Sequence, residues 1–237
     1  DPDCIDFRSG LPDLQVFPMV RWHQAQRLAE DRFGTSLLSY GPAEGMEELR
    51  LEIARYLMRA RSWPAKPENI VIASGTTQAI GLAARVMAQL GKTQAWVEDP
   101  VTADIPRILA GNGIQVHDSP VEADGISLAS LPPSLENGFV YVTPSHQYPT
   151  GTVLSLAKRT EILSRCPDAA IIEDDYDSEF RYAGPPLPPL VALDPERVLY
   201  LGTFSKTLAP GLRIAWLHLP SRLTSLAREM KWLSDLH

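Results

Sequence analysis

The sequence predicts an α/β protein in which a mostly parallel sheet lies between two layers of helices. Seven short apolar runs are bounded by turn residues, and helical patterns lie between several of them. The runs are apolar at consecutive positions, which is typical of strands buried on both faces. Because alternating strands and helices of this kind build a parallel sheet that is covered on both sides, we expect three layers.

The elements follow from the spacing of apolar residues and from the turn residues that bound them. A helix opened by Pro18 is expected at 19–33, and a second helix, with its apolar residues on one face, at 45–61. The expected strands are 69–74, 94–99, 114–117, 139–143, 169–174, 198–203 and 213–219. Further helices are expected at 76–90, 102–110, 155–165 and 220–237.

Composition and charge limit the classes of function. Of the 237 residues, 44% are hydrophobic and 22% are charged, which excludes disorder as the main state. The formal charge of −7 makes binding of nucleic acid or of an anionic membrane by this chain alone unfavourable. No leader-like segment or apolar span is present, so we expect a cytoplasmic protein. Cys4 and Cys166 lack metal-ligand spacing, so no metal site is expected.

Ligands of open α/β sheets bind beyond the carboxyl ends of the strands, so the segments that follow the strands are the candidates for a site. After the first strand, Gly75 permits close backbone approach, and the amides of Thr76 and Thr77 would face an anion at the start of a helix. An ordinary strand–helix turn with a hydroxyl cap explains this segment equally simply. Taken alone, the segment favours that simpler interpretation.

An acidic run follows the fifth strand. Asp174 would lie at the end of this strand and point into the cleft, with Tyr176 two residues further on. A calcium loop is excluded because Phe180 stands where a glycine is needed. A solvated acidic turn explains Asp177 and Glu179 but not Asp174, which directly follows an apolar strand.

At the end of the sixth strand, Thr203 and Ser205 precede Lys206, and Arg213 begins the next expected strand. A lone lysine is usually solvated. A lysine among hydroxyls, followed by an arginine that enters a buried strand, suits a Schiff base beside a phosphate that the arginine holds. His146 follows another strand, and we interpret it as structural rather than as a general base.

Several segments together carry a resemblance that none of them carries alone. They are IDFRSGLPD (5–13), YGPAEGMEELR (40–50), SGTTQA (74–79), VEDP (97–100), TPSHQYPTG (143–151), IIEDDYDSEFRY (171–182) and GTFSKTLAPGLRIAW (202–216). The set resembles the fold type I enzymes that depend on pyridoxal 5'-phosphate, the class I/II aminotransferase superfamily. More narrowly, it resembles the aminotransferase-like domain of MocR-type transcriptional regulators of the GntR family.

The resemblance implies a cofactor site and a role for each residue in it. Lys206 would form the Schiff base, Asp174 would pair with the pyridine nitrogen, and Tyr176 would donate to the phenolic oxygen of the cofactor. The phosphate would be held by Gly75, Thr76, Thr77, Thr203, Ser205 and Arg213. Tyr40 would reach the phosphate of a partner subunit, which implies a homodimer with shared sites. Gly10 would border the substrate pocket.

The chain also departs from the aminotransferase pattern. Tyr148 stands where transaminases usually have Asn before Pro-Thr-Gly, a change that the MocR group shares. Thr102 stands where an aromatic residue usually stacks on the cofactor ring. The resemblance divides the chain into an N-terminal arm with the pocket loop (1–44), a cofactor-binding large domain (45–219) and the start of a helix (220–237). That helix would lead to a small C-terminal domain, from which we expect the chain to have been truncated.

Three functions are compatible with these observations. The first is the amino-compound-sensing part of a MocR-type regulator. The second is a stand-alone aminotransferase that moves an amino group between an amino acid and a 2-oxo acid. The third, a metal-binding α/β domain that uses the acidic run, is disfavoured because it leaves Lys206 and Arg213 unexplained.

Overall fold

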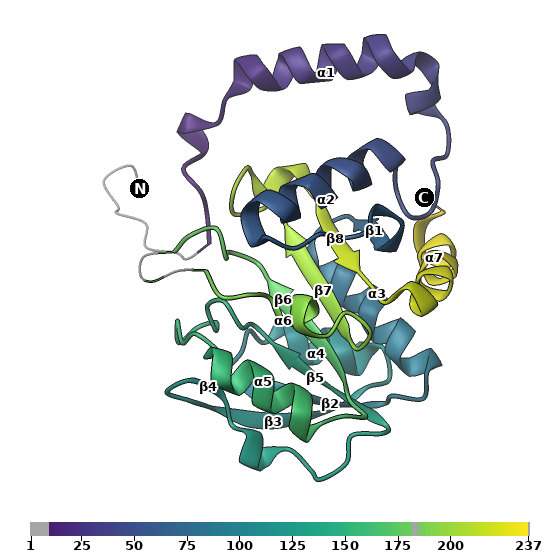
Figure 1. Ribbon diagram of the computed structural model, residues 1–237. Coiled ribbons are helices and arrows are strands. Elements are labelled where there is room, and N and C mark those ends of the chain that lie inside the picture. Colours follow the sequence, from purple (N-terminus) through teal and green to yellow (C-terminus); the bar gives the residue numbers. More distant parts are fainter. Residues whose placement is uncertain (1–9, 182–183, 185, 237) are drawn as a thin grey trace.

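The computed structural model describes residues 10–181, 184 and 186–236, and it contains one sheet of eight strands between two helical layers (Figure 1). Residues 5–9 and Tyr182 of the resembling segments, and Cys4, lie outside the described residues. The strand order is β1-β8-β7-β6-β5-β2-β3-β4. The strands are β1 (Ile70–Ala73), β2 (Gln94–Asp99), β3 (Gln115–Glu122), β4 (Gly125–Ile126), β5 (Gly138–Val142), β6 (Ala170–Asp175), β7 (Val198–Thr203) and β8 (Ala215–His218).

The sheet is mostly parallel, as predicted. Each neighbouring pair in the series β7, β6, β5, β2 and β3 is parallel. The strand β8 runs antiparallel to both of its neighbours, and β4 pairs antiparallel with β3. The carboxyl ends of the parallel strands therefore meet at one edge of the sheet, where ligands of such folds bind.

Each face of the sheet is covered by its own helices and has its own core. On one face, α3 (Thr76–Gln89), α4 (Asp104–Gly111) and α7 (Ser221–Asp235) pack their apolar residues on the strands. On the other face lie α2 (Glu47–Arg61), α5 (Leu156–Arg165) and α6 (Leu190–Leu193). Successive residues of a strand point to opposite faces, so Ile171 of β6 joins one core and Ile172 the other. The predicted three-layer α/β fold is confirmed.

All seven predicted strands are present, and two of them, 94–99 and 198–203, have the predicted bounds. The strand expected at 114–117 continues to Glu122, beyond its apolar part. It can contain Pro120 because β4 pairs only with Val121 and Glu122, which leaves the rest of β3 at the edge of the sheet. The short elements β4 and α6 were not predicted.

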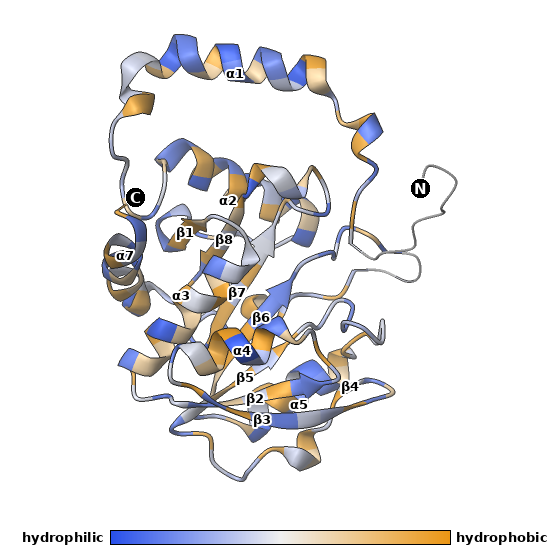
Figure 2. Ribbon diagram, turned by 180° about the vertical axis from the view of Figure 1, so that it is seen from behind, coloured by the Kyte–Doolittle hydropathy of each residue, from blue (hydrophilic) through white to orange (hydrophobic). Residues whose placement is uncertain are grey.

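The helix α1 (Met19–Phe33) has the predicted bounds but stands apart from the layers (Figure 1). It contains no buried residue. Figure 2 shows hydrophobic residues gathered on the strands at the centre of the molecule, whereas α1 carries a mixture of hydrophobic and hydrophilic residues. Large apolar side chains on and around α1, such as Val16, Val20 and Leu38, are exposed. None of the described helices is both long and apolar enough to span a membrane.

Candidate functional site

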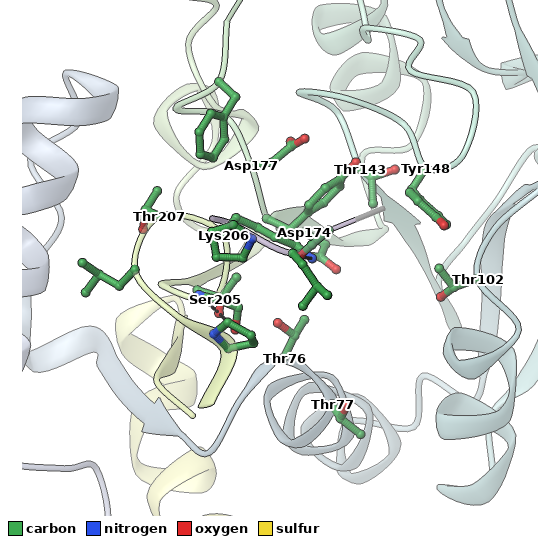
Figure 3. A pocket seen from close by; sticks show the side chains of 18 of the residues that line it. Thr76, Thr77, Thr102, Thr143, Tyr148, Asp174, Asp177, Ser205, Lys206 and Thr207 are labelled. Atoms are coloured by element: carbon green, nitrogen blue, oxygen red, sulfur yellow. Dashed lines mark hydrogen bonds between the residues drawn. The ribbon is translucent and has the colours of Figure 1, made fainter. Parts of the chain in front are cut away.

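A cavity of about 970 Å³ lies at the carboxyl ends of β5, β6 and β7, where the fold places ligands. Segments far apart in the sequence line it. They include the start of the described chain, the first turn of α3, the start of α4 and the segment that follows β7. Figure 3 shows Lys206 and Asp174 close together in this cavity, with Ser205 and Thr76 on one side of them.

Most of the side chains singled out in the sequence line this one cavity. They are Gly10, Thr76, Thr77, Thr102, Tyr148, Asp174, Tyr176, Asp177, Thr203, Ser205, Lys206 and Arg213. Gly75 lies directly beside it, against Arg213. Tyr40 is not among the lining residues of its own chain, and 75% of it is exposed. His146 also lies outside the lining.

The Lys206 amine contacts the beginning of the described chain. Its Nζ donates a hydrogen bond of 2.9 Å to the carbonyl oxygen of Gly10. Gly10 has a φ of +87°, and a Cβ at this position would lie 2.5 Å from Nζ. A glycine is therefore needed here twice, for its backbone conformation and for the close approach of the lysine. The N-terminal arm thus forms one wall of the space around Lys206.

Arg213 lies over the first turn of α3. Its Nη2 donates to the Ser74 carbonyl at 2.8 Å, and a Cβ on Gly75 would come within 2.0 Å of the same nitrogen. The guanidinium and the free amides at the N-terminus of α3 therefore face the same space, which is the arrangement that binds phosphate and other anions. The sequence prediction that Arg213 begins a strand is wrong. Its φ of +54° is left-handed, and β8 begins two residues later.

Thr203 and Ser205 hold the turn between β7 and Lys206. The Thr203 hydroxyl accepts from the Ser205 amide at 3.1 Å and lies 2.9 Å from the Ser205 hydroxyl. It also lies 3.2 Å from the carbonyl oxygen of Ile214, the residue that precedes β8. These contacts connect the lysine turn to the segment that carries Arg213.

Asp174 is buried and only partly satisfied. Its Oδ2 accepts a hydrogen bond of 2.5 Å from the Tyr141 hydroxyl, whereas its buried Oδ1 has no hydrogen-bond partner among the described residues. Burial raises the pKa of the Asp174 carboxyl to about 6, although the bond from Tyr141 opposes the rise. An unpaired buried oxygen is costly, and a protonated ring nitrogen would satisfy it. This orphaned oxygen and the cradle formed by Gly75 and Arg213 both fit a phosphorylated pyridine.

Tyr176 already has a partner within the protein. Its hydroxyl donates to the His146 carbonyl at 2.9 Å, and the ring of His146 contacts Asp177 through Nδ1 at 2.9 Å. Burial raises the pKa of Tyr176 above its usual value, so the phenol keeps its proton. A phenol has one proton to give, so donation to a cofactor oxygen would require it to exchange the His146 carbonyl for that oxygen.

The sequence assigned no individual role to three residues in or beside the cavity lining, Tyr141, Thr143 and Glu98. Tyr141 of β5 reaches Asp174, as described above. Glu98, at the end of β2, is buried and accepts from the amide and the hydroxyl of Thr143, at 3.0 and 2.5 Å. Burial raises the pKa of Glu98 to about 7. Tyr141 and Thr143 are alternate residues near the end of the fourth predicted strand, and their polar atoms could have marked one face of it as facing a site.

Asp175, the next residue of β6, serves a different group of partners. It accepts from the hydroxyls of Ser145, Ser178 and Tyr200, at 2.7, 2.8 and 2.6 Å. The Nε of the buried Arg61 lies 3.0 Å from its Oδ2. The acidic run is thus divided between the cavity and the interior. No group of three or more His, Cys, Asp or Glu residues in the described part of the chain is arranged to hold a metal ion.

Comparisons with known proteins place this geometry in context. The model of the family described as "Aminotransferase class I and II" matches residues 2–233. The HTH-type transcriptional regulator YdeL of Bacillus subtilis is 36% identical, over 95% of this chain and 49% of its own length. The probable rhizopine catabolism regulatory protein MocR of Rhizobium meliloti is 35% identical, over 94% and 45%. The chain therefore spans about half the length of these curated relatives.

A solved structure agrees with the fold. The α-aminoadipate aminotransferase LysN of Thermus thermophilus superposes with a TM-score of 0.85 at 28% identity, over 98% of this chain and 60% of that one. That structure contains N-(5'-phosphopyridoxyl)-L-leucine, in which a phosphorylated pyridine is joined to an amino acid.

Proposed function

The chain belongs to the class I and II aminotransferase family, and on that premise we propose that it binds pyridoxal 5'-phosphate and senses an amino compound as part of a MocR-type transcriptional regulator. One observation carries the proposal. Three groups line one cavity: the amine of Lys206, the arginine Arg213 above a helix N-terminus, and Asp174, whose buried Oδ1 has no hydrogen-bond partner among the described residues.

Each of these groups matches one part of the cofactor. The phosphate dianion would lie between Arg213 and the amides of Thr76 and Thr77, with the hydroxyl of Ser205 as a further donor. The Asp174 carboxylate would pair with the ring nitrogen and favour its protonated form. Lys206 would supply the amine that attaches the cofactor covalently.

The bound cofactor would supply an aldehyde that condenses with amines and a ring that withdraws electrons. The protein residues orient it and control protons. Tyr176 stays protonated, so its hydroxyl has one hydrogen to donate. The hydrogen bond from Lys206 to the Gly10 carbonyl, at 2.9 Å, holds the amine beside the N-terminal arm.

The sensing role is favoured by the relatives. YdeL and MocR, at 36% and 35% identity, are named as regulators, and both are more similar in sequence to this chain than the transaminase described below. Tyr148, in place of the usual Asn, also favours the regulator. The alternative, a stand-alone aminotransferase, is supported by the 2-aminoadipate transaminase of Thermus thermophilus, which is 30% identical over the whole chain. For either function we propose a cytoplasmic location.

We further propose a homodimer with shared sites. The exposed apolar residues around α1, including Val16, Val20 and Leu38, form a surface that a second copy would cover. Tyr40 lies at the end of the same arm, outside the cavity of its own chain, and would contact the phosphate in the partner's site. The arm (1–44) would then complete two sites, while residues 45–219 form the cofactor domain and 220–237 extend from it.

Absorbance tests the cofactor proposal. Adding pyridoxal 5'-phosphate to the chain should produce a visible-edge band that survives dialysis and is trapped by borohydride. Lys206→Ala should lose this band. Lys66→Ala, which changes an exposed lysine outside the cavity, should keep it. A borohydride-reducible adduct that persists in Lys206→Ala would refute the assignment of the lysine.

A panel of amino compounds then separates the two functions. A sensor should show a saturable spectral shift with an amino compound and no accumulation of a 2-oxo acid. An aminotransferase should release the 2-oxo acid over many turnovers, and that result would overturn the sensing proposal while leaving the cofactor site intact.

A further inference from the structure

We propose that Tyr141 is a positioning residue that holds Asp174 as an anion with one oxygen turned toward the cavity. The inference rests on the proposed function, because the group that Asp174 would bind is the protonated ring nitrogen of the cofactor. Neither the sequence motifs nor the roles that the resemblance implies include Tyr141. Its place in the structure supports the assignment.

The strand register brings the two side chains together. β5 and β6 are parallel, and Tyr141 is paired with Ile172, two residues before Asp174 on the same face of β6. The tyrosine is fully buried, and its hydroxyl reaches forward along the strands to Oδ2 of Asp174 at 2.5 Å. Oδ1 is left without a partner among the described residues, and both side chains line the cavity. The bond therefore fixes which oxygen remains available.

The charges around Asp174 mostly oppose its ionisation. Burial raises the pKa of its carboxyl, and the acidic Asp175 and Asp177 raise it further. The charge of Asp174 in turn raises the pKa of the buried Glu98. Two groups lower the pKa of Asp174. The hydrogen bond from Tyr141 has the larger effect, and the positive charge of Lys206 has the smaller one. Tyr141 is thus the main group among these that keeps Asp174 anionic near neutral pH.

Tyrosine suits this task because it can only donate here. Burial and the nearby Asp174 charge raise the pKa of Tyr141 well above its usual value, so the phenol does not lose its proton to the carboxylate. Because the phenol keeps its own proton, it is no base for the proton of a pyridinium, and the Asp174 carboxylate would be the acceptor. The proton of the ring nitrogen would therefore stay between that nitrogen and Oδ1.

The neighbouring strand provides a matched control. Tyr200 of β7 is as deeply buried as Tyr141, and its hydroxyl donates to Asp175 at 2.6 Å. Asp175 has two further hydroxyl donors and Arg61, and it lies outside the cavity lining. Replacing Tyr200 by Phe removes the same kind of buried hydroxyl from the opposite face of the sheet, where it contacts Asp175 rather than Asp174.

The test begins with the protein before any cofactor is added. The pKa of the Asp174 carboxyl is followed by carbon-13 NMR in wild type, Tyr141→Phe and Tyr200→Phe. Loss of one hydrogen bond to a charged group should raise the pKa of Asp174 by about one unit, a tenfold change in proton affinity, in Tyr141→Phe. Tyr200→Phe should leave this value unchanged. Equal pKa values in wild type and Tyr141→Phe, or an equal rise in both variants, would overturn the proposal.

The second measurement follows the pH dependence of the cofactor band. The midpoint pH is the pH at which half of the change in the band has occurred. It should be higher in Tyr141→Phe than in wild type, and it should be unchanged in Tyr200→Phe. If Tyr141→Phe does not fold, 3-fluorotyrosine at position 141 keeps the shape and strengthens the donor, so the pKa of Asp174 and the midpoint should fall. A rise or no change would refute the assignment. Should wild type bind no cofactor, the proposed function fails, whereas the NMR comparison still tests Tyr141.

Discussion

Asp174 and Asp175 are adjacent on β6, and they differ in how completely the protein satisfies them. Asp175 accepts from three hydroxyls and pairs with the buried Arg61. Asp174 accepts from one hydroxyl and presents a buried oxygen that has no hydrogen-bond partner in the described part of the chain. Because successive strand residues point to opposite faces, one carboxylate meets the interior and the other meets the cavity.

The difference teaches how a single strand can serve both stability and binding. A buried charge with a full set of partners holds elements together, and here the Asp175 network joins α2, β7 and the segments after β5 and β6. A buried charge with an unfilled position costs stability until a ligand fills it. The same substitution at the two positions should therefore have opposite effects.

Asp175→Asn should produce the largest effect. It removes the negative charge beside Arg61, whose burial lowers its pKa while Asp175, Tyr200 and Glu173 together raise it by more than that. Leaving the guanidinium buried without its anion should lower the free energy of unfolding by about 3–5 kcal/mol. Urea denaturation of the protein without cofactor measures this loss. A change below about 1 kcal/mol would mean that the network does not hold the fold.

Asp174→Asn should stabilise the protein without cofactor. The folded state raises the pKa of Asp174 from 3.8 to about 6, so ionisation destabilises it by up to about 3 kcal/mol at pH 7. The folded state retains its proton between about pH 4 and 6 while the unfolded state loses it, so wild-type stability should fall across this range relative to the variant. Urea denaturation at pH 4, 5, 6 and 7 gives this difference, and a constant offset would contradict it.

Two arginines, Arg61 and Arg213, extend the comparison. Arg61 is buried in the Asp175 network, whereas Arg213 is exposed and donates to the Ser74 carbonyl. Arg213→Ala should weaken cofactor binding at least tenfold, since one charge-assisted bond to phosphate contributes about 1.5–3 kcal/mol. Its effect on unfolding without cofactor should stay within about 0.5 kcal/mol. Absorbance titration and urea denaturation separate the two, and unchanged affinity would place the phosphate elsewhere.

The sequence predicted the fold but not the contacts between individual strands. Apolar runs with clear boundaries, such as 94–99 and 198–203, report local pattern, and these strands have the predicted bounds. Arg213 was placed in a strand because the apolar residues after it continue the run. Its left-handed backbone is set by the preceding turn, which the pattern of apolar residues does not record.

The site was predicted as a set of residues but not as a network. Lys206, Asp174 and Arg213 stand out because polar residues follow apolar strands, and the structure brings all three to one cavity. Tyr141 stayed hidden inside an apolar run, since its importance depends on the register of β5 against β6. The contrast between Asp174 and Asp175 likewise depends on partners from distant segments, which one sequence does not reveal.

Thr102→Phe should give the smallest effect. It tests whether the cavity beside Asp174 can accept a larger side chain, which the buried surroundings of Asp175 should not. Thr102 lines the 970 Å³ cavity and stands where the resembled enzymes carry an aromatic residue. A phenyl ring stacked on the cofactor should contribute about 0.5–1.5 kcal/mol, a gain in affinity of roughly two- to tenfold. The matched enlargement Ser145→Phe, at a buried hydroxyl bound to Asp175, should instead destabilise the fold. Cofactor titration and urea denaturation of both variants decide the point. Weaker binding by Thr102→Phe would show that position 102 does not face the ring. The part of the cavity beside Thr102 would then contact a different part of the ligand.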